Sequence, residues 1–311
     1  MTISGGARSS RKELWLSGKG AVIVQPREFA WPDGARIAVM VTVLLESWSE
    51  RTAPSYSPMT TPLKPGAYDR AGVTWASYGA RNGIWRLIRI LDAFGIKSTV
   101  CTSAKTIEMH PETLQTVLRR GHEIAAHSYT QDMIHAYLTP EEEQENIRRC
   151  IRIFEQHLGT RPAGWISPVL ASTDHTTRLV CQEGFLWHGD YNEIDLPMIV
   201  RTEHGATVAL PHTDFADNRV LRQSPDAYFD AYRGTFDYLY TEEPGSLINL
   251  TIHCQFGGRP LIAAQFAKIL KYFKGHPGVW FPRHDELARW FSSLDLEEVH
   301  FQDRFAMLEM G

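Results

Sequence analysis

The sequence has few cysteines, no concentrated positive charge and no long apolar run. The cysteines show no CxxC spacing, which argues against a disulfide framework or a zinc knuckle: Cys101, Cys150, Cys181 and Cys254. The 32 basic residues are scattered among 36 acidic ones, so no surface for nucleic acid or an anionic membrane is indicated. No run approaches the ~20 apolar residues of a membrane-spanning helix, and residues 1–30 lack the apolar block of a signal peptide. These absences predict a cytoplasmic protein.

The composition is that of a globular protein, with a hydrophobic fraction of 43% that can fill a substantial core. A chain of 311 residues has room for two domains, but barrel folds commonly run to roughly 200–250 residues as one unit. We therefore expect one large domain. Histidine and aromatic residues are abundant, with 13 His, 11 Tyr and 9 Trp, and several lie near strand-like runs, where sites are commonly built.

The pattern of apolar residues predicts strands that alternate with helices. Residues 36–45 form a near-continuous apolar run, typical of a buried central strand, and residues 51–74 form an irregular, proline-containing loop. The other predicted strands are 97–102, 123–126, 163–167, 184–188, 206–210 and 247–252. Three predicted helices begin at Asn82, Pro111 and Pro140. Four more are predicted near residues 172–182, 224–241, 262–274 and 284–291. This alternation indicates a mainly parallel sheet with helices outside it, either doubly wound or closed into a barrel.

Residues suited to chemistry follow the predicted strands. In parallel α/β folds the active site lies at the carboxyl ends of the strands, so the residues just beyond each strand are expected to meet there. They include acids, histidines and tryptophans: Glu46, Trp48, His127, Trp165, His188, Asp190, Asp195 and His253. A carboxylate that activates water, a histidine that protonates a leaving nitrogen and apolar walls together indicate a hydrolytic site. Neither GxGxxG nor a P-loop motif follows any strand.

Several stretches in this order resemble the polysaccharide deacetylase, or NodB-homology, superfamily. They are WPDGARIAV at 31–39, YGARNGIWRL at 78–87, GHEIAAH at 121–127, DLP at 195–197 and HCQFGGRP at 253–260. The resemblance is strongest to the branch of cofactor-free allantoinases and cyclic-amide and cyclic-imide hydrolases. It implies a distorted (β/α) barrel, a single α/β catalytic domain over residues 26–311. An N-terminal arm, residues 1–25, precedes this domain, and its Trp15 and Leu16 are expected to support a homo-oligomer.

The resemblance also implies catalytic roles. Glu46 takes the position of the general base and His253 that of the general acid. His127 is expected to donate to the substrate carbonyl or the oxyanion, or to bind a metal if one is present. Burial at the end of an apolar strand is expected to raise the pKa of Glu46.

A metal is not favoured. The resemblance places Ser47 and Gln131 where metal-dependent deacetylases have an aspartate and a second histidine, and serine and glutamine are weak ligands for zinc. No cofactor is therefore expected. The alternative is one divalent metal (Zn) held by Glu46 and His127, with His135 or Asp190 completing the set.

Other candidates line the predicted site. The tryptophans are expected to form walls, the polar side chains to bind substrate and the arginines to anchor a carboxylate product: Trp48, Trp165, Ser128, Gln131, Asp195, Arg259 and Arg283. The sequence does not decide whether four residues belong to the site or have a structural role: His135, His188, Asp190 and Asp195. His122 is expected to have a structural role.

The sequence thus predicts a hydrolase of a non-peptide C–N bond in a small cyclic amide, such as a hydantoin-like ureide or a cyclic imide. Water activated by Glu46 would open the ring. The first alternative is a metal-dependent N-deacetylase of an amino sugar or other N-acyl compound. The second is a non-catalytic binding protein. In each case the expected partner is a small molecule, without nucleic acid or membrane.

Overall fold

The computed structural model describes residues 22–25, 30–60, 63–64, 66–213, 215–220 and 223–300. A nine-stranded sheet has the order β10-β2-β3-β4-β5-β6-β8-β7, with β9 also paired to β2. Its strands are β2 (Ile37–Leu45), β3 (Thr99–Thr102), β4 (Glu123–Ala126), β5 (Gly164–Trp165), β6 (Trp187–Tyr191), β7 (Met198–Thr202), β8 (Gly205–Pro211), β9 (Ser246–His253) and β10 (Val279–Trp280). A second sheet pairs β1 (Val22–Gln25) with β11 (Glu297–His300).

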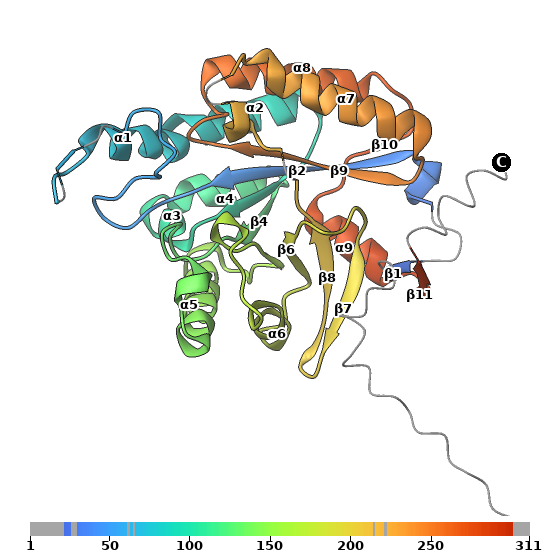
Figure 1. The fold of residues 1–311 in the computed structure, drawn as a ribbon, viewed down its shortest axis with the longest axis horizontal. Helices are drawn as coiled ribbons and strands as arrows, with labels where there is room; N and C mark the ends of the chain where they lie inside the picture. The colour runs from blue at the N-terminus through green and yellow to red at the C-terminus, as the bar shows by residue number, and fades with distance from the viewer. Residues whose placement is uncertain are drawn as a thin grey trace, which may run out of the picture.

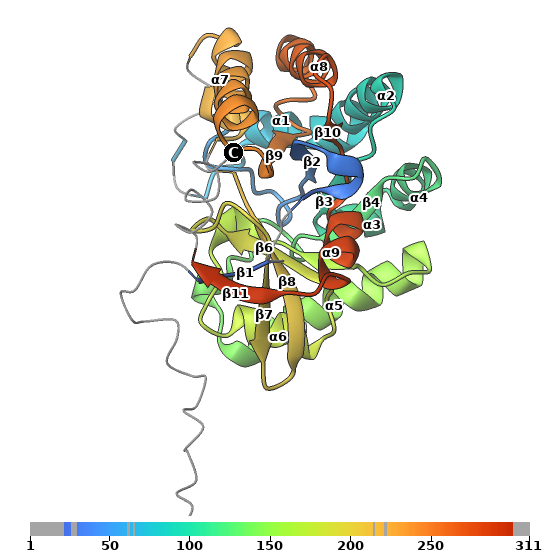
Figure 2. The same cartoon turned by 90° about the vertical axis from the view of Figure 1, so that its right-hand side faces the viewer.

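Helices surround the curled sheet (Figures 1 and 2). They are α1 (Arg70–Tyr78), α2 (Ile84–Phe94), α3 (Ala104–Met109), α4 (Pro111–Arg119), α5 (Pro140–Leu158), α6 (Thr176–Gln182), α7 (Asp226–Glu242), α8 (Pro260–Lys274) and α9 (His284–Ser292). The curled, mainly parallel sheet with its outer helices confirms the predicted distorted (β/α) barrel in a single α/β domain. Of the helices described, none is long and apolar enough to cross a bilayer.

The central strand β2 is buried along its whole length. Its side chains alternate between the two faces of the sheet. Val41 and Val43 pack in the cluster under the outer helices, whereas Met40 and Leu44 pack in the cluster inside the barrel. Burial on both faces explains why residues 36–45 read as a near-continuous apolar run.

The strand register brings the predicted catalytic residues to one edge of the sheet. Leu45 of β2 and Ala126 of β4 are aligned with the same residue of β3. The next residues, Glu46 and His127, therefore leave the sheet at the same level. His253 is the last residue of β9, which pairs in parallel with β2, and so it ends at the same edge.

Several elements differ from the predictions, among them α3, β10, β1 and β11, which were not predicted. α1 begins at Arg70, inside the predicted loop 51–74, because the Asp69 side chain accepts the Gly72 N–H and caps the helix. A π-helical turn, Gly79–Gly83, then joins α1 to α2. β7 was not predicted; it forms an antiparallel hairpin with β8 at the edge of the sheet.

The four cysteines are free and buried. Burial raises the pKa of each thiol: Cys101, Cys150, Cys181 and Cys254. Most of the predicted N-terminal arm, including Trp15 and Leu16, lies outside the described residues.

Candidate active site

Glu46 is the centre of a buried polar cluster, and its side chain is 7% exposed. Its Oε2 accepts hydrogen bonds from the Tyr56 hydroxyl at 3.2 Å and from the Gln255 amide. The same amide donates to the Tyr56 hydroxyl at 2.9 Å. Its Oε1 lies 3.5 Å from Nε2 of His127. A buried carboxylate needs such partners, because an unpaired charge is costly to remove from water.

The surroundings of Glu46 lower the pKa of its carboxyl. Burial raises this pKa, but the charge of His253 and the hydrogen bonds of His127 and Gln255 outweigh burial. The prediction that burial would raise it is therefore wrong, because the histidines lie close enough to favour the ionised form. At neutral pH Glu46 is a carboxylate, which is the form that a general base requires.

His127 is held in one orientation by the backbone. Its Nδ1 donates to the carbonyl oxygen of Ile166 at 2.8 Å, because that oxygen can only accept. Nε2 therefore faces Glu46. Both ring nitrogens of His127 are thus directed at protein groups.

His253 is held by Asp217. Its Nδ1 donates to Asp217 Oδ1 at 2.6 Å, and its backbone N–H donates to Asp217 Oδ2 at 3.0 Å. Burial lowers the pKa of His253, but the carboxylates of Asp217 and Glu46 outweigh it and raise this pKa to about 9. At neutral pH His253 is protonated, and its Nε2–H can act as a general acid.

Three residues of this cluster were missed by sequence reasoning. Tyr56 lies in the irregular loop, and Asp217 begins the short helical turn η5 (Asp217–Val220). Neither residue directly follows a strand, so a search for polar residues at strand ends does not find them. Gln255 is different, because it lies two residues beyond His253 within the HCQFGGRP stretch. It could have been chosen as a polar residue at the same strand end.

The residues near His127 brace its loop. Gln131 donates from Nε2 to the His127 carbonyl oxygen at 2.8 Å. Ser128 has a positive φ of 60°, and its hydroxyl accepts a hydrogen bond from Asn146 at 2.8 Å. Trp48 is half-buried, and its carbonyl oxygen accepts from Lys105 at 3.2 Å. The polar side chains of Ser128 and Gln131 are therefore engaged with protein groups.

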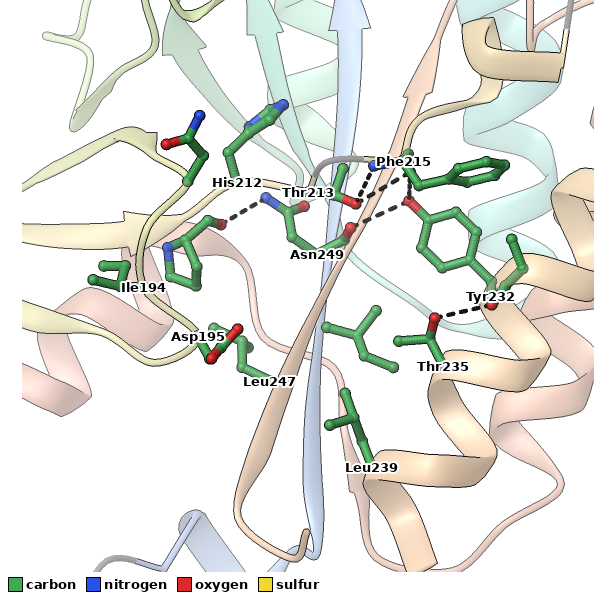
Figure 3. Close-up of a pocket in the computed structure, with 14 residues that line it drawn as sticks. Ile194, Asp195, His212, Thr213, Phe215, Tyr232, Thr235, Leu239, Leu247 and Asn249 are labelled. Carbon is green, nitrogen blue, oxygen red and sulfur yellow. Dashed lines mark hydrogen bonds between the residues drawn. The ribbon is translucent and has the colours of Figure 1, made fainter. Parts of the chain in front are cut away.

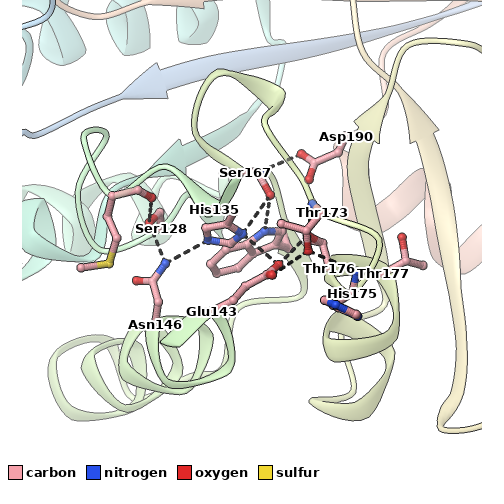
Figure 4. A network of polar contacts seen from close by, with 12 residues as sticks. Ser128, His135, Glu143, Asn146, Ser167, Thr173, His175, Thr176, Thr177 and Asp190 are labelled. Atoms are coloured by element: carbon pink, nitrogen blue, oxygen red, sulfur yellow. Dashed lines mark hydrogen bonds and ion pairs between the residues drawn. The ribbon is translucent and has the colours of Figure 1, made fainter. Parts of the chain in front are cut away.

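His135 belongs to a buried polar network with Glu143 and Asn146 beside that loop (Figure 4). Trp165 is fully buried and stacks on His135, with ring centroids 5.3 Å apart. His135 donates from Nδ1 to Glu143 at 3.1 Å and accepts from Asn146 at its Nε2 at 3.0 Å. The structure thus places Trp165 in the core and gives His135 a structural role.

His188 and Asp190 form a second buried pair, with Nε2 and Oδ2 2.7 Å apart. Asp190 also accepts the Ser167 backbone N–H at 2.7 Å through Oδ1. The pair ties β6 to the loop after β5.

Among the described residues, neither predicted carboxylate anchor bonds to Glu46, although Arg259 bonds to Gln255, which is a partner of Glu46. Arg283 donates to Asp285 and to the carbonyl oxygen of Gly121, which precedes β4, so it lies at the opposite end of the sheet. Arg259 stacks 4.2 Å above the Tyr78 ring and donates to the Gln255 carbonyl oxygen at 3.0 Å, joining α1 to the loop after β9.

Asp195 lines a cavity of about 270 Å³, and His212 lines the same cavity. This cavity is lined by β8, β9 and α7 and includes Tyr232, Thr235 and Asn249 (Figure 3). Among the described residues, no hydrogen bond or ion pair joins Asp195 to Glu46.

The donor set does not fit a metal ion held by the protein. Among the described residues, no group of three or more His, Cys, Asp or Glu side chains could hold one. Where the resemblance places metal ligands, the Ser47 hydroxyl bonds Thr106 at 2.6 Å and the Gln131 amide is turned to the His127 carbonyl oxygen. These neutral groups are poor zinc ligands and are already engaged.

Comparison with known proteins identifies similar chains. Residues 73–186 match a family model described as polysaccharide deacetylase. The chain is 22% identical to a peptidoglycan deacetylase of Helicobacter pylori over 242 residues, which is 66% of this chain and 82% of that protein. It is also 22% identical to a putative polysaccharide deacetylase of Schizosaccharomyces pombe, covering 85% of this chain and 92% of that one.

Two solved structures are similar over most of the barrel. Puue allantoinase is 30% identical with a TM-score of 0.77, covering 85% of this chain and 93% of that chain. A probable polysaccharide deacetylase from Pseudomonas aeruginosa PAO1 is 28% identical with a TM-score of 0.77 and the same coverage.

Proposed function

Because the chain belongs to the polysaccharide deacetylase superfamily, we propose that it hydrolyses a carbon–nitrogen bond other than a peptide bond, with Glu46 and His253 as its base and acid. The observation that carries this proposal is the opposite charge of these two buried groups. The pKa of Glu46 is lowered, whereas that of His253 is raised to about 9. Pairs of titratable groups whose environments set different protonation states assign the base and the acid.

In the proposed reaction Glu46 takes a proton from a water molecule while the water oxygen attacks the amide carbonyl carbon. A tetrahedral intermediate forms, and its oxygen carries the negative charge. His253 then gives its Nε2 proton to the leaving nitrogen as the C–N bond breaks. The products are a carboxylic acid and an amine or amide. Transfer of a proton from Glu46 to His253 through solvent restores the starting charges.

For the substrate we place an N-acyl compound first. The family model and the Helicobacter pylori and Schizosaccharomyces pombe proteins are all described as deacetylases. These names support the N-deacetylase alternative better than the cyclic amide that the sequence predicted. The proposed deacylation differs from that alternative in one respect, because the donor set around Glu46 does not fit a protein-held metal.

A small cyclic amide is the second candidate substrate. Two observations favour it, namely the donor set without a metal-binding group and the 30% identity to a structure described as an allantoinase. The same acid–base pair would open a ring, because a ring amide and an N-acyl group present the same carbonyl and leaving nitrogen.

One assay separates these substrates. Purified protein is incubated with an N-acetylglucosamine oligomer, allantoin, hydantoin and succinimide, and the release of acetate or a ring-opened acid is measured. Acetate from the sugar supports deacylation, and a ring-opened acid supports cyclic-amide hydrolysis. If the protein binds one of these compounds but hydrolyses none of them, the result would support a binding protein and contradict a hydrolase.

The predicted cytoplasmic location and homo-oligomer stay proposals. Light scattering of the full chain tests the second, and a monomer would contradict it.

A further inference from the structure

The half-buried histidine His212 lies at the same end of the barrel and has no part in the reaction above. It follows β8, and its backbone N–H donates to the Tyr191 carbonyl oxygen at 2.7 Å, which continues the pairing of β8 with β6. Side chains alternate along a strand, and Val208 and Leu210 belong to the cluster inside the barrel. His212 therefore points inward. Figure 3 shows its ring turned away from Asp195 toward the end of the sheet where β2 and β9 finish.

The ring of His212 has an unused nitrogen. Its Nδ1 is buried and has no hydrogen-bond partner. Burial, together with the charges of His127 and His253, lowers the pKa of His212 to about 4 against the opposing charge of Asp190. The imidazole is thus neutral at neutral pH, with one nitrogen that donates and one that accepts. A buried polar atom without a partner is unfavourable, so this nitrogen is suited to a ligand that enters the site.

The proposed reaction needs such a donor. The carbonyl oxygen of the substrate gains negative charge, and active sites place hydrogen-bond donors where that charge develops. His127 was predicted for this task, but its Nδ1 donates to Ile166 and its Nε2 faces Glu46. The Nε2–H of His253 is needed by the leaving nitrogen. His212 is close enough to His127 and His253 for their charges to affect its pKa, and its Nδ1 has no hydrogen-bond partner among the described residues.

We propose that His212 donates a ring N–H to the carbonyl oxygen of the scissile amide and stabilises the oxyanion that forms there. This rests on the proposed function, because it assigns a donor to the same reaction. It makes His212 a catalytic residue, since its ring would touch a reacting atom. It also moves the oxyanion role from His127 to a residue on a different strand.

The kinetic test compares two variants of His212 on the substrate found in the assay above. His212→Phe keeps the ring shape but removes the donor, so kcat is expected to fall about 10²–10³-fold, with a smaller change in KM. His212→Gln keeps an N–H donor and is expected to recover part of that loss. The melting temperature of His212→Phe is expected to stay level or rise, because Nδ1 of the ring has no hydrogen-bond partner among the described residues.

His122 provides the matched control. It is buried, its Nε2 also has no hydrogen-bond partner, and burial lowers its pKa to about 4, but it precedes β4 at the other end of the sheet. His122→Phe is expected to keep the wild-type kcat. If His212→Phe keeps kcat within threefold while Glu46→Gln is inactive, the role of His212 is overturned and the proposed function stands. Wild-type protein without turnover would count against the proposed function instead.

A binding measurement tests His212 without turnover. Protein labelled with ¹⁵N-histidine and carrying Glu46→Gln is titrated with acetamide, which presents an amide carbonyl. A second sample that also carries His212→Phe identifies the His212 resonance, because that resonance is missing from its spectrum. The His212 resonance is expected to shift when acetamide binds. Absence of that shift at saturating acetamide would overturn the proposal.

Discussion

Asp217 holds His253 at two points, through its ring Nδ1 at 2.6 Å and through its backbone N–H at 3.0 Å. These contacts fix the end of β9 and leave Nε2 of the ring to face a substrate. They also join a residue of η5 to a strand that lies 36 positions further along the chain.

Asp217→Asn is expected to move the alkaline limit of activity. The reaction needs protonated His253, so wild-type activity is lost as the pH rises through about 9. Loss of the Asp217 charge lowers this pKa toward the ordinary value of 6.5, and the loss of kcat/KM then begins at lower pH. At a pKa of 6.5 about one quarter of His253 is protonated at pH 7, so kcat/KM there is expected to fall about fourfold. A profile of kcat/KM from pH 5 to 10 tests this, and an unchanged alkaline limb would contradict it.

The same pair affects stability. The raised pKa of His253 contributes stability that is fully present below pH 6.5 and is lost as the pH rises through about 9. In chemical denaturation the difference in unfolding free energy between wild type and Asp217→Asn is therefore expected to shrink between these pH values. A constant difference would show that Asp217 acts on stability without this charge.

Glu46→Gln is expected to lower kcat about 10²–10⁴-fold, because the amide cannot take a proton from water. Glu123→Gln is the matched control. Glu123 is buried in β4, and burial together with Asp285 raises its pKa to about 7, but it lies at the opposite end of the strand from His127. We expect that control to keep its kcat even if its melting temperature falls. Equal activity of Glu46→Gln and wild type would remove Glu46 as the base.

Gly83→Ala is expected to reduce both stability and activity. A Cβ at Gly83 would lie 1.9 Å from the backbone oxygen of Cys254, next to His253, so the strand end must move. The expected cost is about 1–3 kcal/mol in unfolding free energy. Gly234→Ala in α7 is the control, because its Cβ meets open space and alanine favours a helix. Denaturant melts and kcat of both variants check this, and equal behaviour would show that the contact is unimportant.

Removal of metal ions is expected to leave activity unchanged. The donor set around Glu46 contains no group that could hold a metal ion among the described residues. Protein treated with a chelator and then passed through a desalting column should keep its kcat, and elemental analysis should find less than stoichiometric zinc. Loss of activity that zinc restores would establish a metal-dependent reaction.

Much of the fold was predictable because each strand carries a local apolar signal. The run 36–45 marked β2, and parallel pairing then brought Glu46, His127 and His253 to one edge. Asp217 carried no such signal, because its importance comes from a contact between distant segments. His212 was missed for a related reason, since it follows the strand predicted at 206–210 but only the structure shows its unpartnered nitrogen.

The pKa of Glu46 shows a second limit of prediction from sequence. Its burial was predictable from the apolar run, but the direction of the shift depends on how near His253 and His127 lie. Sequence spacing cannot supply those distances. The role predicted for Arg283 met the same limit, because only the structure shows that Arg283 lies at the opposite end of the sheet and pairs with Asp285.

The buried cysteines have a practical consequence for labelling. A thiol reacts as the thiolate, and burial both raises the thiol pKa and blocks the approach of reagents. Native thiols in the folded protein should therefore be inert to maleimides. A cysteine introduced at Tyr137, which is 81% exposed beside the loop after β4, would then be a unique attachment point for a fluorophore. Such a probe could report the movement of that loop without removal of any native cysteine.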